Sequence, residues 1–271
     1  MVHEFDPGYG HEPFATLVGD YPGEEAYPLN RFRTEWGPIF HRGRLDGSAV
    51  VVVVGQDPAQ HEAIVRRILV GEAGQRVQGA LARLGITRRY VMVNTFLYSV
   101  VGAGGSKADV TKPAIAGYRN RWLDALVAGS PVQAVVTLGL RARQAWELWA
   151  GGHPDHGLAV AHLTHPTAPE SAGGGREAKA AAMRRLCANW NRELSSLHER
   201  LTARDVEVAW QPYGEALTAA DLAPIPEADL PAGLPGWMRA VDAWASRTGT
   251  TTQLKRSTIV VKIPRRFQPP A

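Results

Sequence analysis

The stretch Ala49–Glu62 reads AVVVVVGQDPAQHE, and it decides the fold. Its run of valines leaves no polar face, which is typical of a strand buried on both sides of a parallel sheet. The run ends abruptly at the loop GQDP, which places the carboxylate of Asp57 where the chain leaves the core. In open α/β sheets, ligands bind in the crevice beyond the carboxyl ends of the strands. Asp57 is therefore either part of such a site or a cap of the following helix.

Strands and helices alternate after this stretch. Short apolar, β-rich runs predict further strands at residues 88–98, 131–139 and 158–166. Helical spacing predicts helices at residues 60–69, 74–84, 113–128, 140–150 and 176–201, and the Gly-rich segment 101–113 is expected to be mobile. Such alternation implies right-handed crossovers and helices on both sheet faces. We predict an α/β fold, three-layer α/β/α, with a central four-stranded, mainly parallel sheet.

The pattern changes near residue 206. A Pro-rich stretch is followed by a predicted short helix at residues 237–246 and a strand-like segment at residues 257–264. We therefore expect residues 1–205 to form one domain and residues 206–271 to form a C-terminal extension that packs on the core.

Composition narrows the class of protein. No apolar run is long enough to span a membrane, and the first residues lack signal-peptide character, so we expect a cytoplasmic monomer without a membrane partner. The single cysteine, Cys187, excludes an internal disulfide and a four-cysteine metal or iron–sulfur site within one chain. The four histidines between residues 153 and 165 lack compact ligand spacing, so we expect no metal and no cofactor.

Charge is spread unevenly along the chain. Residues 1–47 hold four arginines against eight acidic residues, whereas residues 60–129 hold ten Lys and Arg against four acids. A polyanion such as DNA would bind the second segment by releasing counterions. The alternative is a set of solvated helix faces.

Polar groups occur where three of the four predicted strands end. Gln56 and Asp57 follow the first strand, Asn94 lies within the second, and His165 follows the fourth. Because the carboxyl ends of parallel strands share one edge of the sheet, these groups are expected to converge. Asn94 as a turn residue and Thr167 as a helix cap are the structural alternatives.

Three motifs in this order carry a resemblance to a known family. GQDPA at residues 55–59, VNT at 93–95 and HPT at 165–167 resemble motifs of the uracil-DNA glycosylase superfamily. The first is similar to the GQDPY loop of one family, and the layout of residues 69–100 is similar to that of the thermophile-type, iron–sulfur-containing enzymes. The resemblance covers about residues 45–200.

The resemblance implies a role for each matching residue. Asp57 would activate water and stabilise the cationic sugar, while His165 would donate a hydrogen bond to O2 of the leaving base. Asn94 would read the Watson–Crick edge of uracil, which cytosine cannot match. The remaining base-binding positions would be Gly55, Gln56, Ala59 and Leu69.

DNA contacts are also implied by the resemblance. The target base must be flipped out of the duplex, so the protein must hold the flanking strand. Thr167 matches a phosphate-contacting serine of the family, Pro169 falls where a leucine wedge fills the vacated stack, and Arg176 would lie near phosphate.

Two positions depart from the family pattern. Ala59 replaces the tyrosine that excludes 5-methyl groups, so 5-substituted uracils should be accepted unless Phe96 or Tyr98 fills the space. Leu69 replaces the aromatic residue that stacks on the base.

The predicted function is a monofunctional glycosylase that hydrolyses uracil from single- or double-stranded DNA and leaves an abasic site. The alternatives are a glycosylase for another deaminated or damaged base, a non-catalytic DNA-binding protein of the same fold, and a small-molecule α/β hydrolase.

Overall fold

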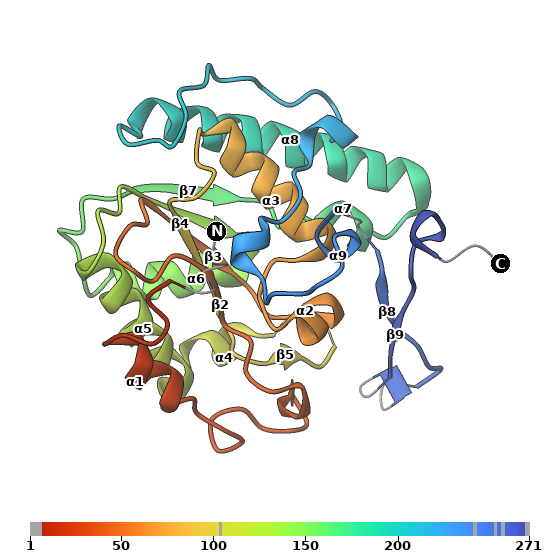
Figure 1. Ribbon diagram of the computed structural model, residues 1–271, viewed down its shortest axis with the longest axis horizontal. Helices are drawn as coiled ribbons and strands as arrows, with labels where there is room; N and C mark the ends of the chain where they lie inside the picture. Colours follow the sequence, from red (N-terminus) through yellow and green to blue (C-terminus); the bar gives the residue numbers. More distant parts are fainter. Residues whose placement is uncertain (1–6, 103–104, 241–242, 252–253, 256–257, 269–271) are drawn as a thin grey trace.

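A mainly parallel sheet forms the centre of the computed structural model, which describes residues 7–102, 105–240, 243–251, 254–255 and 258–268 (Figure 1). The sheet has five strands in the order β2-β4-β3-β6-β7. Their bounds are β2 His41–Gly43, β3 Val51–Gly55, β4 Tyr90–Asn94, β6 Ala134–Leu138 and β7 Ala159–Leu163. The four predicted strands are confirmed and run parallel to one another, whereas β2 pairs antiparallel with β4 at the edge.

The valine run explains how the sheet joins two helical layers. Alternate residues of a strand point to opposite faces. Val52 and Val54 pack into a core with α1 (Phe14–Gly19), α5 (Pro113–Ala128) and α6 (Gly139–Ala150). Val51 and Val53 pack on the other face with α3 (Gly71–Arg83) and α8 (Gly175–Arg200). The strand is apolar throughout because both of its faces are buried, and the three-layer α/β/α fold is confirmed.

Shorter elements connect and flank the layers. The helices are α2 Gln60–Val65, α4 Lys107–Thr111, α7 Ala168–Ser171 and α9 Trp237–Ala240, and the 3₁₀ turns are Thr34–Trp36, Ala219–Asp221, Glu227–Asp229 and Arg265–Phe267. Two small antiparallel ladders join β1 (Phe32–Arg33) to β5 (Ser99–Val100) and β8 (Ala245–Arg247) to β9 (Ile259–Val261). None of the helices in the described ranges is long and apolar enough to cross a membrane.

Several predicted boundaries differ from the structure. The helix expected at residues 60–69 ends at Val65, because Arg66 takes the left-handed conformation with a φ of 65°. The helix expected at residues 237–246 ends at Ala240, and residues 245–247 instead form β8. The Gly-rich segment 101–113, expected to be mobile, contains α4, while residues 103 and 104 lie outside the described part.

Residues from 206 onward run along the α3 and α8 side of the molecule and lead to β8, which contacts α2 (Figure 1). Tyr213 is buried in the core under α8. A separate apolar cluster joins Val65 and Val70 of the first part of the chain to Ile225, Leu230, Trp237 and Trp244. Residues from both parts of the chain therefore share this buried apolar cluster.

Candidate active site

A cavity of about 280 Å³ lies beyond the carboxyl ends of the central strands. It is lined by residues that follow β3, β4 and β7, as the topology requires. Eight of the ten site residues predicted from sequence line it: Gly55, Gln56, Asp57, Ala59, Leu69, Asn94, His165 and Thr167. Pro169 and Arg176 lie outside it, against a separate cleft on α7 and α8.

The Asp57 carboxylate is fixed by two hydrogen bonds. Oδ1 accepts from the Gln56 side-chain amide at 3.0 Å, and Oδ2 accepts from the backbone N–H of Val100 at 2.9 Å. Arg33 donates to the carbonyl of Val100 and thereby anchors β5. Burial raises the pKa of Asp57, and the two hydrogen bonds, with the charges of Arg33 and Arg247, partly oppose that rise. The carboxylate is thus held in one orientation at the end of β3.

The ring of His165 is oriented by Thr167. The backbone N–H of Thr167 donates to Nδ1 of His165 at 3.3 Å, and the Thr167 hydroxyl lies 3.2 Å from the same atom. Because Nδ1 accepts a hydrogen bond here, the proton of a neutral ring belongs on Nε2. Burial lowers the pKa of His165, which favours this neutral form. The imidazole is therefore arranged as an Nε2–H donor.

Asn94 is placed over Gly55. The two residues lie side by side in the register of β4 and β3. A Cβ atom at position 55 would come within 2.5 Å of Oδ1 of Asn94, so the amide needs a glycine there. Asn94 is 2% exposed, and its amide nitrogen makes one long contact of 3.5 Å with the carbonyl of Ile39. Most of its hydrogen-bonding capacity is left for the cavity.

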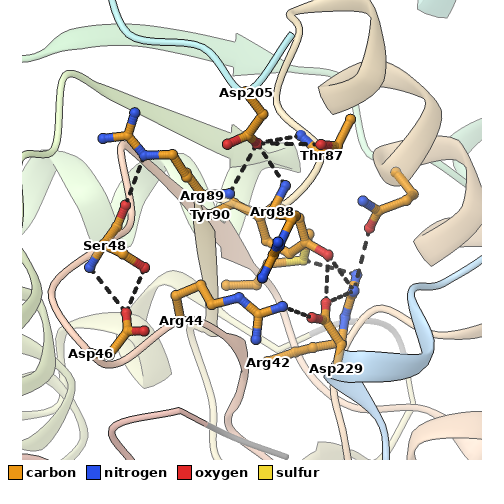
Figure 2. Close-up of polar contacts among 12 residues, drawn as sticks. Arg42, Arg44, Asp46, Ser48, Thr87, Arg88, Arg89, Tyr90, Asp205 and Asp229 are labelled. Atoms are coloured by element: carbon orange, nitrogen blue, oxygen red, sulfur yellow. Dashed lines mark hydrogen bonds and ion pairs between the residues drawn. The ribbon is translucent and has the colours of Figure 1, made fainter. Parts of the chain in front are cut away.

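A buried arginine holds the loop that carries Leu69. Arg42 of β2 donates from Nε to the carbonyl of Ile68 at 3.0 Å and from Nη2 to the carbonyl of Leu69 at 3.2 Å. Leu69 has a φ of 53°, a left-handed conformation that a leucine rarely adopts. Figure 2 shows Arg42 and Arg44 both meeting Asp229, at 2.7 and 3.1 Å. The C-terminal extension thus supports the cavity wall through a buried ion pair.

Glu62 is a second carboxylate of the cavity that sequence reasoning did not single out. It accepts hydrogen bonds from the backbone N–H of Ala59 at 3.0 Å and from that of Val70 at 3.1 Å. It therefore ties the loop after β3 to the loop before α3. Burial raises the pKa of Glu62 to about 7, and the charge of Asp57 adds to the rise. Its position three residues after Ala59, at the start of a helix, was the available signal.

Part of the cavity wall comes from a segment far from Ala59 in the chain. Phe96 and Tyr98, the bulky neighbours considered from sequence, pack in the core with Phe32 and Tyr27 and do not line the cavity. Ala243 and Ala245 line it instead, and the backbone N–H of Ala245 donates to Nε2 of His61 at 3.2 Å. Two alanines of the C-terminal extension therefore line the same cavity as Ala59, where the resemblance expects a tyrosine.

The loop after β7 is clamped by Arg76. This side chain donates to the carbonyl of Pro166 and pairs with Glu170 at 2.8 Å. Pro169 is buried in α7, so it does not fit the expected wedge, which must be exposed to enter a base stack. Arg176 is exposed at the start of α8.

Several cations of the basic segment 60–129 interact with other groups of the protein. Arg76, Arg83 and Arg121 form ion pairs with acidic side chains. Arg119 is 1% exposed and donates to the carbonyl of Val110. These four of the ten cations of the segment therefore have partners within the protein.

No group of three or more His, Cys, Asp and Glu side chains within the described ranges could hold a metal ion. Cys187 lies on the buried face of α8.

The family model of the uracil DNA glycosylase superfamily matches residues 42–186, from β2 into α8. The chain belongs to this superfamily. A comparison with curated proteins returns no significant match. The superfamily places the chain among the DNA glycosylases, hydrolases of base excision repair that act on DNA. The matched region contains the loop after β3 that carries Asp57, the end of β4 with Asn94, and the loop after β7 that carries His165.

Proposed function

We propose that the protein is a monofunctional uracil-DNA glycosylase, which hydrolyses the N-glycosidic bond of uracil in DNA and leaves an abasic site. The observation that carries this proposal is the meeting of Asp57, Asn94 and His165 in one cavity at the carboxyl edge of the sheet. Breaking an N-glycosidic bond creates a cationic sugar and an anionic base. The cavity offers a carboxylate for the first and a neutral donor for the second.

In this mechanism Asp57 faces the sugar. Its carboxylate stabilises the developing cation and orients the attacking water. The hydrogen bonds from Gln56 and Val100 leave the charge in place and remove the need to reorganise it during the reaction.

His165 acts on the leaving base. Its Nε2–H donates to O2 of uracil as negative charge develops there, while Thr167 keeps Nδ1 as the acceptor. A single preorganised donor of this kind contributes about 3–4 kcal/mol to transition-state stabilisation.

Asn94 selects the base. Its amide accepts from N3–H and donates to O4 of uracil, a pattern that cytosine reverses. The glycine at position 55 supports this role because it leaves room for the amide. The small residues near Ala59 favour a wider range at C5, so 5-hydroxymethyluracil and thymine opposite guanine are proposed as secondary substrates.

Hydrolysis, as opposed to β-elimination, is supported by the composition of the cavity. A glycosylase that also cuts the strand needs an amine nucleophile to form a Schiff base. The described residues that line the cavity include no lysine.

The test uses end-labelled oligonucleotides that contain uracil, 5-hydroxymethyluracil, a T·G mismatch or cytosine at one position. We expect strand cleavage of the uracil substrate only after alkali, weaker cleavage of the next two, and none of cytosine. Asp57→Asn is the matched control for contaminating activity and should cleave about 10²- to 10³-fold more slowly. Cleavage without alkali would refute the monofunctional assignment, and intact uracil DNA would refute the substrate.

A further inference from the structure

The last part of the chain is basic without exception. Residues 243–271 contain six lysines and arginines and no acidic residue: Arg247, Lys255, Arg256, Lys262, Arg265 and Arg266. The chain as a whole has a net charge of only +4, so this short segment differs from its surroundings. A block of like charge that repels itself is typical of a surface that meets a polyanion.

The segment is built as a hairpin beside the cavity. β8 and β9 pair in antiparallel register, and the backbone N–H of Lys262 donates to the carbonyl of Trp244 at 2.7 Å. Figure 1 shows the hairpin standing out from the α/β core beside α2. Its base is fixed to the cavity wall, since Trp244 is 1% exposed and packs edge-on against His61. The hairpin therefore has a defined position relative to Asp57.

The cations of the hairpin are exposed and make no ion pair with any other described residue. This holds for Arg247, Lys262, Arg265 and Arg266. Arginines nearer the core differ, because Arg76 and Arg83 are paired with carboxylates. Cations that form no ion pair on a projecting element can attract an external anion, and salt weakens this attraction.

A cleft of about 880 Å³ runs along the hairpin. Lys262 and Arg265 line it together with the apolar side chains of Val261 and Ile263. A strand of DNA presents phosphates and sugar carbons in alternation, so cations beside apolar surface match its chemistry. Arg247 lies at the cavity side of the hairpin, near enough for its charge to lower the pKa of Asp57.

We propose that the β8–β9 hairpin and residues 262–266 form a DNA-binding arm, which grips backbone phosphates of the strand next to the flipped nucleotide. This inference rests on the proposed function, because a base held in the cavity requires the flanking strand to pass its mouth. The arm supplies affinity and position, and the chemistry stays with the cavity.

The test compares two double variants with the wild-type protein. Lys262→Ala/Arg265→Ala removes the two cations of the cleft. Arg88→Ala/Arg200→Ala is the matched control, because both side chains are exposed near the opposite edge of the sheet, before β4 and at the end of α8. All four side chains lie on the surface, so both variants should fold.

Binding to a fluorescent duplex without uracil is measured by anisotropy between about 50 and 200 mM salt. We expect the arm variant to bind at least about tenfold more weakly at low salt, and the slope of log K against log[salt] to flatten by about two, since each phosphate contact contributes about 0.9. The control should match the wild-type protein. The single-turnover rate of uracil release at saturating DNA should be unchanged in both variants.

Equal affinity and equal slope in the arm variant and the control would overturn the inference. So would a loss confined to the single-turnover rate, which would assign these side chains to the chemistry. The proposed function fails separately, if the wild-type protein binds DNA normally but releases no uracil.

Discussion

Asp57 shows how one residue can be both buried and charged. Desolvation favours its protonated form, while two hydrogen bonds and two arginine charges favour its carboxylate. The net effect is a pKa above the ordinary 3.8. His165 shifts the other way, because burial lowers its pKa and keeps the ring neutral. The pair is thus prepared as carboxylate and neutral imidazole over the same range of pH.

The raised pKa of Asp57 and the lowered pKa of His165 together predict how the rate of the reaction depends on pH. The single-turnover rate should fall as the pH drops through the raised pKa of Asp57, because protonation would remove the charge that stabilises the sugar cation in the proposed mechanism. The midpoint of the acid limb is expected above 3.8. Rapid-quench measurements of uracil release across the acid range will locate it.

The His165→Gln variant distinguishes the contributions of Asp57 and His165 to the pH dependence of the rate. The variant should be slower at every pH, yet its residual rate should keep the same acid limb, since the limb belongs to Asp57. A limb that disappears with His165 would assign it to the imidazole.

The sequence was sufficient to predict that three polar residues meet at one edge of the sheet. Asp57, Asn94 and His165 follow or end buried strands, and parallel topology brings strand ends together. Glu62 and Ala245 were not predicted as part of the cavity. For Glu62 a local signal existed, because it lies three residues after Ala59 and accepts a hydrogen bond from its backbone N–H. Ala245 depends on a contact between segments far apart in the chain, its hydrogen bond to His61, and no local pattern encodes such a contact.

At the scale of elements, the pairing of β3 with β4 determines where the amide of Asn94 lies. Gly55 and Asn94 are partners in the ladder, so any side chain at position 55 meets the amide. The atom in the way is the end of a side chain, which can rotate. Gly55→Ala should therefore displace Asn94 with little change in the thermal unfolding temperature.

The expected cost of Gly55→Ala is in recognition of uracil. Unpaired polar groups in a buried site cost about 1–3 kcal/mol. The single-turnover rate, measured with enzyme in excess of DNA but below saturation, should therefore fall about tenfold to a hundredfold. Adding Asn94→Ala should cost little more, because both changes remove the same contact. Gly117→Ala, where a Cβ meets nothing within 4 Å, is the control. Additive losses would show that Gly55 acts independently of Asn94.

One strand of the central sheet could not be predicted from its own sequence. The four parallel strands follow from their apolar runs, whereas β2 has the sequence His-Arg-Gly and no strand signal. Arg42 is buried there because Asp229, in a 3₁₀ turn nearly at the other end of the chain, neutralises it. A strand that depends on a distant partner for its charge cannot be identified from its own residues.

At the scale of the whole molecule, the C-terminal extension is joined to the catalytic part by polar as well as apolar contacts. Asp205, the last residue before the extension, accepts hydrogen bonds from the backbone N–H groups of Thr87 and Arg88, both at 2.7 Å, just before β4 (Figure 2). Further along, Asp229 meets two arginines of the sheet edge. We propose that residues 206–271 unfold together with residues 1–205 in a single transition.

Asp229→Asn tests this proposal. Arg42 and Asp229 are both fully buried as side chains, and removing one partner of such a pair costs about 3–5 kcal/mol, because the other charge stays buried without compensation. Asp20→Asn is the matched control, since its pair with Arg121 is about half exposed on both sides and should contribute at most about 1 kcal/mol. Urea unfolding is followed by tryptophan fluorescence and by far-ultraviolet circular dichroism. We expect coincident transitions in all proteins and a large loss only in Asp229→Asn. Because Arg42 also holds the carbonyl of Leu69, that variant should lose glycosylase activity at denaturant concentrations where the control is still folded and active. A separate early transition, with activity preserved after it, would show that the extension unfolds on its own and that the cavity does not depend on it.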